Sequence, residues 1–584
     1  TYTTADLIAA LKAGRVTVSI DTALFPAGEL GGGFVKSSGS AAFNAPVAPP
    51  ALDLSRITQT DAARFLTQAT FGPKRSDIDA LVTKGYATWI NEQMAAPPTS
   101  HRRETIDEFN RNATNGGTGT RDAITLAYQR PGGPHRQSAW WKIAVTSPDQ
   151  LRQRVAFALS QTLVISDQNG IIAQWQEGAA NYYDIFVDGA FGNFRDILEQ
   201  VTLSPMMGIY LSSLRNPKAA GGTTPDENYA REIMQLFTVG LNELNPDGTL
   251  RLDPNGQPIP TYSQETIVQT AKVFTGWAYA NNAPNATTNT GLFRGSGANY
   301  IEPMMLWPAF HDDTEKTVIG GRVLPAGQGG PKDLEDTLDA LFNHPSTAPF
   351  ISRQLIQRLV TSNPSPGYIY RVSQTFANNG AGVRGDLGAV VRAILLDYEA
   401  RSPAVAATAT FGKLKEPLLR GTALFRAFDA RSNSGRFNIP NAEGNLAQAA
   451  LRAQTVFNFY EPNFVLPGEV AAAGLYAPEY QILTDTTALT MPNFYYTYIA
   501  TTRSTNAADQ TPLPVFDPLV PIANNHTQLI DTISLLLTAG ALPSAQATRI
   551  ASALAALPNG TPALEKVRMA TYLVLTSPAG AIQK

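Results

Sequence analysis

The sequence predicts a mainly α-helical fold: a large multi-helix globular domain with small β-hairpins and long irregular loops. Apolar residues recur at helical spacing through most of the 584 residues. Strictly alternating runs are short, and stretches rich in Gly, Pro and Asn separate the periodic segments. The composition, 43% hydrophobic and 16% charged, is that of an ordinary globular chain that is long enough to bury a large core.

The chain divides into three predicted segments. Residues 1–55 are an N-terminal extension and linker, with a short helix expected at 3–14 and a strand at 16–20 before a flexible Gly-, Ser- and Pro-rich stretch. Residues 56–500 are the main helical domain. Residues 501–584 are a C-terminal helical segment that we expect to pack on the main domain as a small bundle.

Each predicted helix rests on an apolar stripe at 3.6-residue spacing, and several begin at a capping residue. In the main domain the expected helices cover residues 58–72, 76–94, 138–147, 148–165, 179–191, 192–204, 264–279, 331–345, 347–366, 387–397 and 412–428. In the C-terminal segment they cover residues 526–540, 543–557 and 561–580. Ser263 and Asp386 are the predicted N-caps of two of them.

The densest group of polar side chains lies in residues 224–240, which we expect to form one amphipathic helix ending at Gly240. Thr224 is the predicted N-cap, and Glu227 completes a T-x-x-E capping box. The polar face comprises Glu227, Asn228, Arg231, Glu232 and Gln235. This face is either a solvated surface with i,i+4 pairs or the lining of a pocket.

Candidate catalytic residues come from this helix and from one loop. Glu227 and Glu232 lie roughly 140° apart around the helix axis, so they do not form an acid/base pair by themselves. A hydrolase would use Glu232 or Glu227 as general acid and His311 or Asp312 as base. Carboxylates directly follow His311 in the sequence and would adjust the pKa of its imidazole to suit a general base. The alternative is that this segment is a structural loop.

Five further residues are candidates for substrate binding. Arg231 and Asn228 belong to the same helix face, and Arg358 lies on the polar side of another expected helix. Trp140 and Trp141, close to Lys and Arg residues, would form an aromatic–cation wall that stacks on a sugar or aromatic ligand. Helix packing is the alternative for both tryptophans.

The candidates for metal ligands are His311, Asp312, Asp247 and Asp253. Asp247 and Asp253 fall in two turn signals that flank a short expected hairpin, where calcium or another divalent metal could bind, although the spacing is not that of an EF-hand. Plain turn chemistry is the favoured explanation of both. No other cofactor is identified, and the absence of cysteine excludes thiolate metal sites and a cysteine nucleophile.

Charge and hydropathy bear on partners and location. A net charge of −3 gives no electrostatic case for binding nucleic acid, and no apolar run is long enough for a transmembrane anchor. A chain that opens at Thr1 and lacks cysteine is typical of a processed, exported protein. We therefore expect a periplasmic, cell-surface or extracellular location.

Several segments together resemble the bacterial family known as domain of unknown function 1800. They read RFLTQATFGP, LRQRVAFALSQ, GNFRDILEQVTLSPMMGIYL, PDENYAREIMQLFTVGLNELNPDG, HDDTEKTVIG, HPSTAPFISRQLIQRLVTSNPSP, GVRGDLGAVVRAILLD and VFNFYEPNF. The resemblance runs from about residue 57 to 483 and is weakest in the first fifty residues and the C-terminal tail. It implies a large, mostly helical, exported bacterial protein with a sulfatase-like exported partner protein, and it assigns no catalytic residues.

Three functions stay open, and we favour the first. The first is a hydrolase acting on a glycan or cell-surface polymer, and the second is a non-enzymatic, surface-associated binding or assembly protein that works with a partner. A metal-dependent enzyme using His311, Asp312 and a helix glutamate is a third. If Glu232, His311 and Arg358 converge in one pocket, catalysis is favoured; if they are scattered, binding or assembly is favoured.

Overall fold

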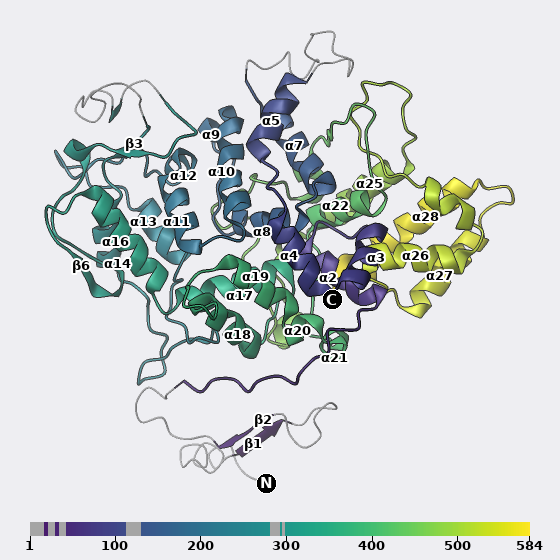
Figure 1. Ribbon diagram of the computed structural model, residues 1–584, viewed down its shortest axis with the longest axis horizontal. Coiled ribbons are helices and arrows are strands. Elements are labelled where there is room, and N and C mark those ends of the chain that lie inside the picture. Colours follow the sequence, from purple (N-terminus) through teal and green to yellow (C-terminus); the bar gives the residue numbers. More distant parts are fainter. Residues whose placement is uncertain (1–16, 21–29, 34–42, 112–129, 281–292, 295–297) are drawn as a thin grey trace.

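Helices make up most of the chain that the computed structural model describes, which comprises residues 17–20, 30–33, 43–111, 130–280, 293–294 and 298–584. Within this part, strands pair only two at a time, in four small antiparallel sheets. The predicted fold class, mainly α with small hairpins and long irregular loops, is therefore confirmed (Figure 1).

The elements follow one another in three groups along the chain. The first comprises β1 (Thr17–Ile20), β2 (Leu30–Gly33), α2 (Gln59–Ala69), α3 (Arg75–Lys84), α4 (Tyr86–Ala95), α5 (His101–Asn110), α7 (Gly133–Thr146), α8 (Gln150–Ser160), α9 (Gly170–Gln174), α10 (Gln176–Gly189), α11 (Phe194–Leu203) and α12 (Pro205–Tyr210). The second comprises α13 (Asn228–Gln235), α14 (Gln264–Val273), β3 (Trp277–Ala278), β4 (Met305–Leu306), η1 (Pro308–Phe310), β5 (Lys316–Val318), η2 (Ile319–Gly321), β6 (Arg322–Leu324), α16 (Gly330–Asn343), α17 (Thr347–Leu359), α18 (Pro366–Ala377), α19 (Leu387–Leu396), α20 (Tyr398–Arg401) and α21 (Pro403–Ala407). The third comprises β7 (Lys413–Leu414), α22 (Pro417–Ala427), α23 (Ala442–Leu446), α24 (Glu469–Ala472), η3 (Pro478–Ile482), α25 (Asp485–Ala500), η4 (Asp517–Ile522), α26 (His526–Thr538), α27 (Ser544–Ala555), α28 (Ala563–Thr576), α29 (Pro578–Ala581) and β8 (Ile582–Gln583).

Local signals explain where several helices begin and end. The predicted N-caps are confirmed: Ser263 accepts a hydrogen bond from the N–H of Thr266 at the start of α14, and Asp386 accepts one from Ala389 at the start of α19. The helix expected over residues 76–94 is instead two helices, because Gly85 between them has a φ of +80°. The helix expected at residues 3–14 lies outside the described residues.

The helix α8 lies at the centre of the molecule (Figure 1). All of its residues are buried, and it packs against α2, α4, α7, α10 and α17. A helix that is buried on every side needs partners for its polar residues as well as for its apolar ones. This requirement brings charged side chains of α8, and of helices around it, into the core.

The C-terminal helices contact the rest of the chain directly. Figure 1 shows α26, α27 and α28 together at one end of the molecule, and α26 packs against α2 and α22. The strand β8 pairs with β7, so Ile582 lies opposite Leu414. One continuous apolar core includes residues from α2 to α28. The boundaries predicted for the N-terminal extension, the main domain and the C-terminal segment remain predictions.

None of the described helices is both long enough and apolar enough to cross a membrane. The core is instead filled by helix-to-helix packing of aromatic and aliphatic side chains.

Candidate functional site

The polar segment after residue 224 forms a shorter helix than predicted. The helix α13 begins at Asn228, whose N–H donates to the Asp226 carboxylate at 2.8 Å, so the predicted cap at Thr224 and its capping box are wrong. The physical reason is Asn216, whose amide bonds both the N–H and the C=O of Asp226, at 2.9 and 3.2 Å. These backbone groups are then unavailable to a helix that starts earlier.

The expected i,i+4 pair is present on the polar side of α13. Arg231 and Glu227 lie 3.5 Å apart, and Gln264 at the start of α14 bonds both, at 2.8 Å to Glu227 and 3.3 Å to Arg231. Asn228 is exposed. This arrangement is that of a solvated face whose side chains link two helices.

Glu232 differs from the other polar residues of α13 because its side chain is buried. Its Oε2 atom has no hydrogen-bond partner in the described part of the chain, and the same holds for the hydroxyl of nearby Tyr262. Burial raises the pKa of Glu232, and the positive charge of Arg231 opposes this only in part. Burial also raises the pKa of Tyr262, to about 12.

His311 is buried with both ring nitrogens engaged. Nδ1 lies 2.9 Å from the carbonyl oxygen of Thr275, and Nε2 lies 3.1 Å from a carboxylate oxygen of Asp333. That oxygen also accepts a hydrogen bond from Lys316 at 2.6 Å. Burial by itself would raise the pKa of Asp333, but hydrogen bonds from His311, Lys316 and Gln328 hold it below its usual value. The imidazole therefore ties a loop to α16.

The three aspartates predicted as metal or catalytic candidates all stabilise turns. Asp312 accepts from the N–H and hydroxyl of Thr314, and these bonds outweigh burial to lower its pKa. Asp247 bonds Thr249 in the same way, and Asp253 accepts two backbone N–H groups. Among the described residues, no three His, Asp or Glu side chains are placed to hold a metal ion.

Trp140 and Trp141 lie in the core, only 3% and 2% exposed. Their rings meet edge to face at 5.4 Å, and the indole N–H of Trp140 donates to the hydroxyl of Tyr183 at 3.2 Å. The wall predicted for a sugar is thus absent from the surface at these positions, because both rings pack between helices.

Arg358 belongs to a group of charges enclosed by the fold, which we call the buried charge cluster: Arg154, Arg358, Lys413, Glu416 and Glu479. The guanidinium of Arg358 lies 4.4 Å above the ring of Tyr460. Its carbonyl oxygen accepts hydrogen bonds from Arg154 at 2.6 Å and Lys413 at 3.1 Å.

Two carboxylates lie among the three cations of this cluster. Lys413 lies 2.9 Å from Glu479 and 3.7 Å from Glu416. Burial favours the neutral form of Glu416, but the charges of Lys413, Arg154 and Arg358 prevail and lower its pKa. The cluster joins α8, α17, β7, α22 and η3 at one point in the core, which is a structural role.

The three residues on which the functional choice depends were expected to share one pocket if the protein is an enzyme. Four cavities in the described part of the chain have other linings, and neither Glu232 nor His311 nor Arg358 contributes to any of them.

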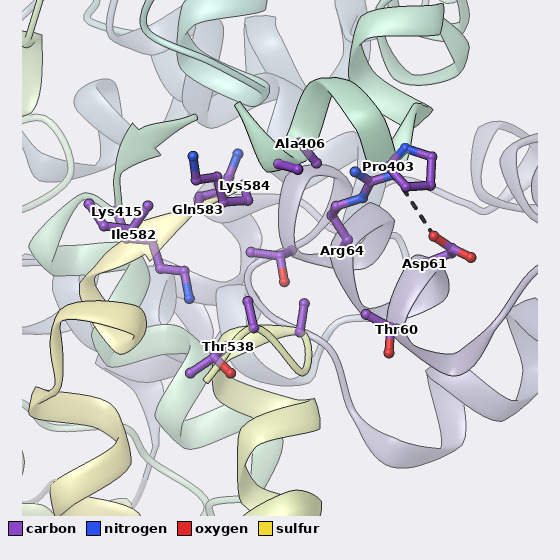
Figure 2. Close-up of a pocket in the computed structure, with 14 residues that line it drawn as sticks. Thr60, Asp61, Arg64, Pro403, Ala406, Lys415, Thr538, Ile582, Gln583 and Lys584 are labelled. Carbon is purple, nitrogen blue, oxygen red and sulfur yellow. Dashed lines mark ion pairs between the residues drawn. The ribbon is translucent and has the colours of Figure 1, made fainter. Parts of the chain in front are cut away.

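One of these cavities has the character of a ligand site. Its volume is about 280 Å³, and it lies among α2, α21, β8 and the C-terminal end of α26 (Figure 2). The walls are mostly apolar, with Pro403, Ala406, Ala539 and Ile582 among the lining residues. This volume is near the lower end of the range for small-molecule sites, which begins at about 300 Å³.

Lys415 is the unusual residue of this cavity. It is 7% exposed, and its amine donates a hydrogen bond of 2.6 Å to the carbonyl oxygen of Leu537 in the last turn of α26. It makes no ion pair with a carboxylate of the described residues. Burial, with a smaller contribution from the charge of Arg420, lowers the pKa of Lys415 to about 7.

A second cavity of about 260 Å³ has polar walls, but its charges are already paired. Arg426 lies 2.9 Å from Asp77, and Lys74 lies 2.6 Å from Asp429. Among the described residues, each charged group that lines this cavity therefore already has a partner. The cavity of Lys415 is the better candidate for a ligand site.

The sequence interpretation missed Lys415 because it assigned residues 412–428 to one helix. The structure instead has the strand β7, followed by a helix that starts at Pro417. The missed signal is the K-L-K alternation directly before Glu-Pro, since two polar residues flanking an apolar one fit a strand and Pro fits the first turn of a helix.

Fold and cavity together define a mainly helical protein with a buried lysine, Lys415, in the lining of a mostly apolar cavity. The chain belongs to the family described as "Protein of unknown function (DUF1800)", whose model matches residues 64–580. The match extends through the C-terminal helices, beyond the limit near residue 483 inferred from the sequence. No curated protein and no solved structure matches the chain.

Proposed function

We propose that this protein is a binding protein rather than a hydrolase, and that the cavity of Lys415 takes a small, mostly apolar molecule with a polar head group. The observation that carries the proposal is a buried amine in a mostly apolar cavity, with one carbonyl acceptor and no carboxylate partner among the described residues. An unpaired polar group costs stability, and a ligand that bonds the amine would recover part of that cost.

The test is thermal stabilisation by short aliphatic ligands. We expect hexanoate and 1-hexanol to raise the melting temperature and soluble oligosaccharides to leave it unchanged. Ala406→Phe should abolish the shift by filling the cavity, whereas Ala404→Phe, on the same helix but not in the lining, should keep it. No shift with any aliphatic ligand would contradict the proposal.

Hydrolysis of a glycan or cell-surface polymer is the second candidate, and one observation favours it. The raised pKa of Glu232 is what a general acid requires. Release of product from a polysaccharide by the wild-type protein, lost in Glu232→Gln, would support this function. Unchanged release in the variant would remove Glu232 from the reaction.

Export and the sulfatase-like partner protein remain parts of the proposal, supported by the family resemblance. Fractionation of cells that produce the full-length precursor tests the location. Co-purification from the same extract tests the partner.

A further inference from the structure

Two lysines just before α22 differ in the number of hydrogen-bond acceptors around their amines. Lys413 donates to the carbonyl oxygens of Gln357 and Arg358, at 2.8 and 3.1 Å, and faces Glu479 at 2.9 Å. Its ammonium therefore has three acceptors. Lys415 is equally enclosed but has a single acceptor, the carbonyl oxygen of Leu537. A neutral amine has two N–H donors and one lone pair, so it needs fewer acceptors than an ammonium, and a single acceptor is compatible with the neutral form.

The other charges of the cavity are occupied elsewhere. Asp61 pairs with Arg64 at 3.9 Å, on the wall opposite Lys415 in Figure 2. Lys584 donates to the carbonyl oxygens of Thr408 and Phe411, at 2.7 and 2.9 Å. Neither group supplies Lys415 with a counter-charge. Lys415 thus contributes to the lining of the cavity without a carboxylate partner among the described residues.

Burial makes the lone pair of the Lys415 amine available at neutral pH. With a pKa of about 7, roughly half of the Lys415 side chains are neutral at pH 7, against on the order of one in a thousand for an ordinary lysine. Desolvated lysines are the ones that act as nucleophiles toward carbonyl carbon.

We infer that Lys415 captures a small aliphatic aldehyde in this cavity as an imine. The inference rests on the proposed function, since it requires the cavity to admit an apolar ligand. It goes further by naming the ligand class and the bond that forms. A structural role for Lys415, as a donor to the end of α26, is the alternative that the test must separate.

The reaction needs no oxidant or reductant. The Nζ lone pair of Lys415 forms a bond to the aldehyde carbon, and the C=O π electrons move to oxygen, which takes up a proton. The carbinolamine then loses its hydroxyl together with the second proton of the nitrogen, as water, leaving C=N. Apolar walls favour an alkyl chain on the aldehyde, and the small volume of the cavity favours a short one.

The experiment treats the protein with hexanal at pH 7, reduces any imine to a stable secondary amine with cyanoborohydride, and locates the adduct by peptide mass spectrometry. We expect labelling at Lys415 at least about tenfold above that of Lys413 or Lys584. Lys415→Met should lose this adduct, and Lys584→Met, which alters the same cavity, should keep it.

Thermal shifts measured alongside separate the two claims. If hexanal and 1-hexanol both stabilise the protein but Lys415 carries no excess label, imine formation at Lys415 is contradicted and the proposed binding function is supported. If neither ligand stabilises it and no label appears, both are overturned. Labelling that is equal on all lysines also overturns the capture.

Discussion

At the residue scale, Lys413 and Lys415 make opposite contributions to stability. Lys413 is enclosed with two carboxylates, whereas Lys415 is enclosed with one carbonyl oxygen and the charge of Arg420 nearby. A buried charge without a partner lowers the free energy of unfolding. A buried ion pair has this effect mainly when one of its two partners is removed. Substitution of each lysine by methionine keeps the size of the side chain and separates these effects.

Lys415→Met should raise the free energy of unfolding by about 2–4 kcal/mol at pH 6. The folded pKa of about 7 lies below the ordinary 10.5, so between these values the unfolded chain binds more protons. The wild-type protein therefore gains stability as pH rises from 7 toward 10.5. Urea unfolding at several pH values should show the advantage of the variant shrinking over this window. An advantage that is absent at pH 6, or constant with pH, would contradict the assignment.

Lys413→Met should have the opposite sign, with a loss of about 3–5 kcal/mol at pH 7, because buried Glu479 would lose its ion pair with Lys413. The same urea experiments measure it. If Lys413→Met leaves the free energy of unfolding unchanged, the buried charge cluster does not depend on the ammonium of Lys413.

At the element scale, the sequence predicted where most helices lie, since caps and apolar stripes are local. It failed where a long-range contact overrides the local pattern. The amide of Asn216 delays the start of α13, and pairing with β8, from the far end of the chain, makes a strand of Lys413–Leu414. The apolar stripe of α13 was predicted correctly for Tyr229 and Ile233, but Glu232 was expected on the polar face and is buried.

Glu232→Gln should stabilise the protein by about 1 kcal/mol at pH 7, because it replaces a buried carboxylate with an orphan oxygen by a neutral group of the same shape. The folded pKa lies above the ordinary 4.5, so the wild-type protein loses stability as pH rises through this interval. The gain of the variant should vanish below pH 4.5.

The matched control is Glu227→Gln, on the same helix. Glu227 is partly exposed and bonded to Gln264, so we expect a change within about 0.5 kcal/mol. If Glu232→Gln is destabilising at pH 7, the carboxylate of Glu232 has a stabilising partner in the folded protein.

At the scale of the whole molecule, the candidate cavity exists only because distant segments meet. Its walls come from α2, α21, β8 and α26, which are separated by most of the chain. No local pattern contains this information. The sequence could identify the family and the helices, whereas the cavity and the enclosed surroundings of Lys415 required the tertiary structure.

The C-terminal helices should unfold together with the main body, because α26 packs on α2 and α22 and β8 pairs with β7. All six tryptophans precede residue 501, so their fluorescence reports only the main body, while far-ultraviolet circular dichroism reports all helices. We expect the two thermal transitions to coincide. A separate transition seen by circular dichroism alone would show that residues 501–584 form an independent unit.

The most direct test of the central claim, that the cavity of Lys415 is a ligand site, is photolabelling with a short alkyl diazirine followed by peptide mapping. We predict labels concentrated in residues 403–407 and 538–541, competed by excess 1-hexanol and lost in Ala406→Phe. Labels spread over the surface, or gathered around Glu232 or in the polar cavity of Arg426, would contradict it.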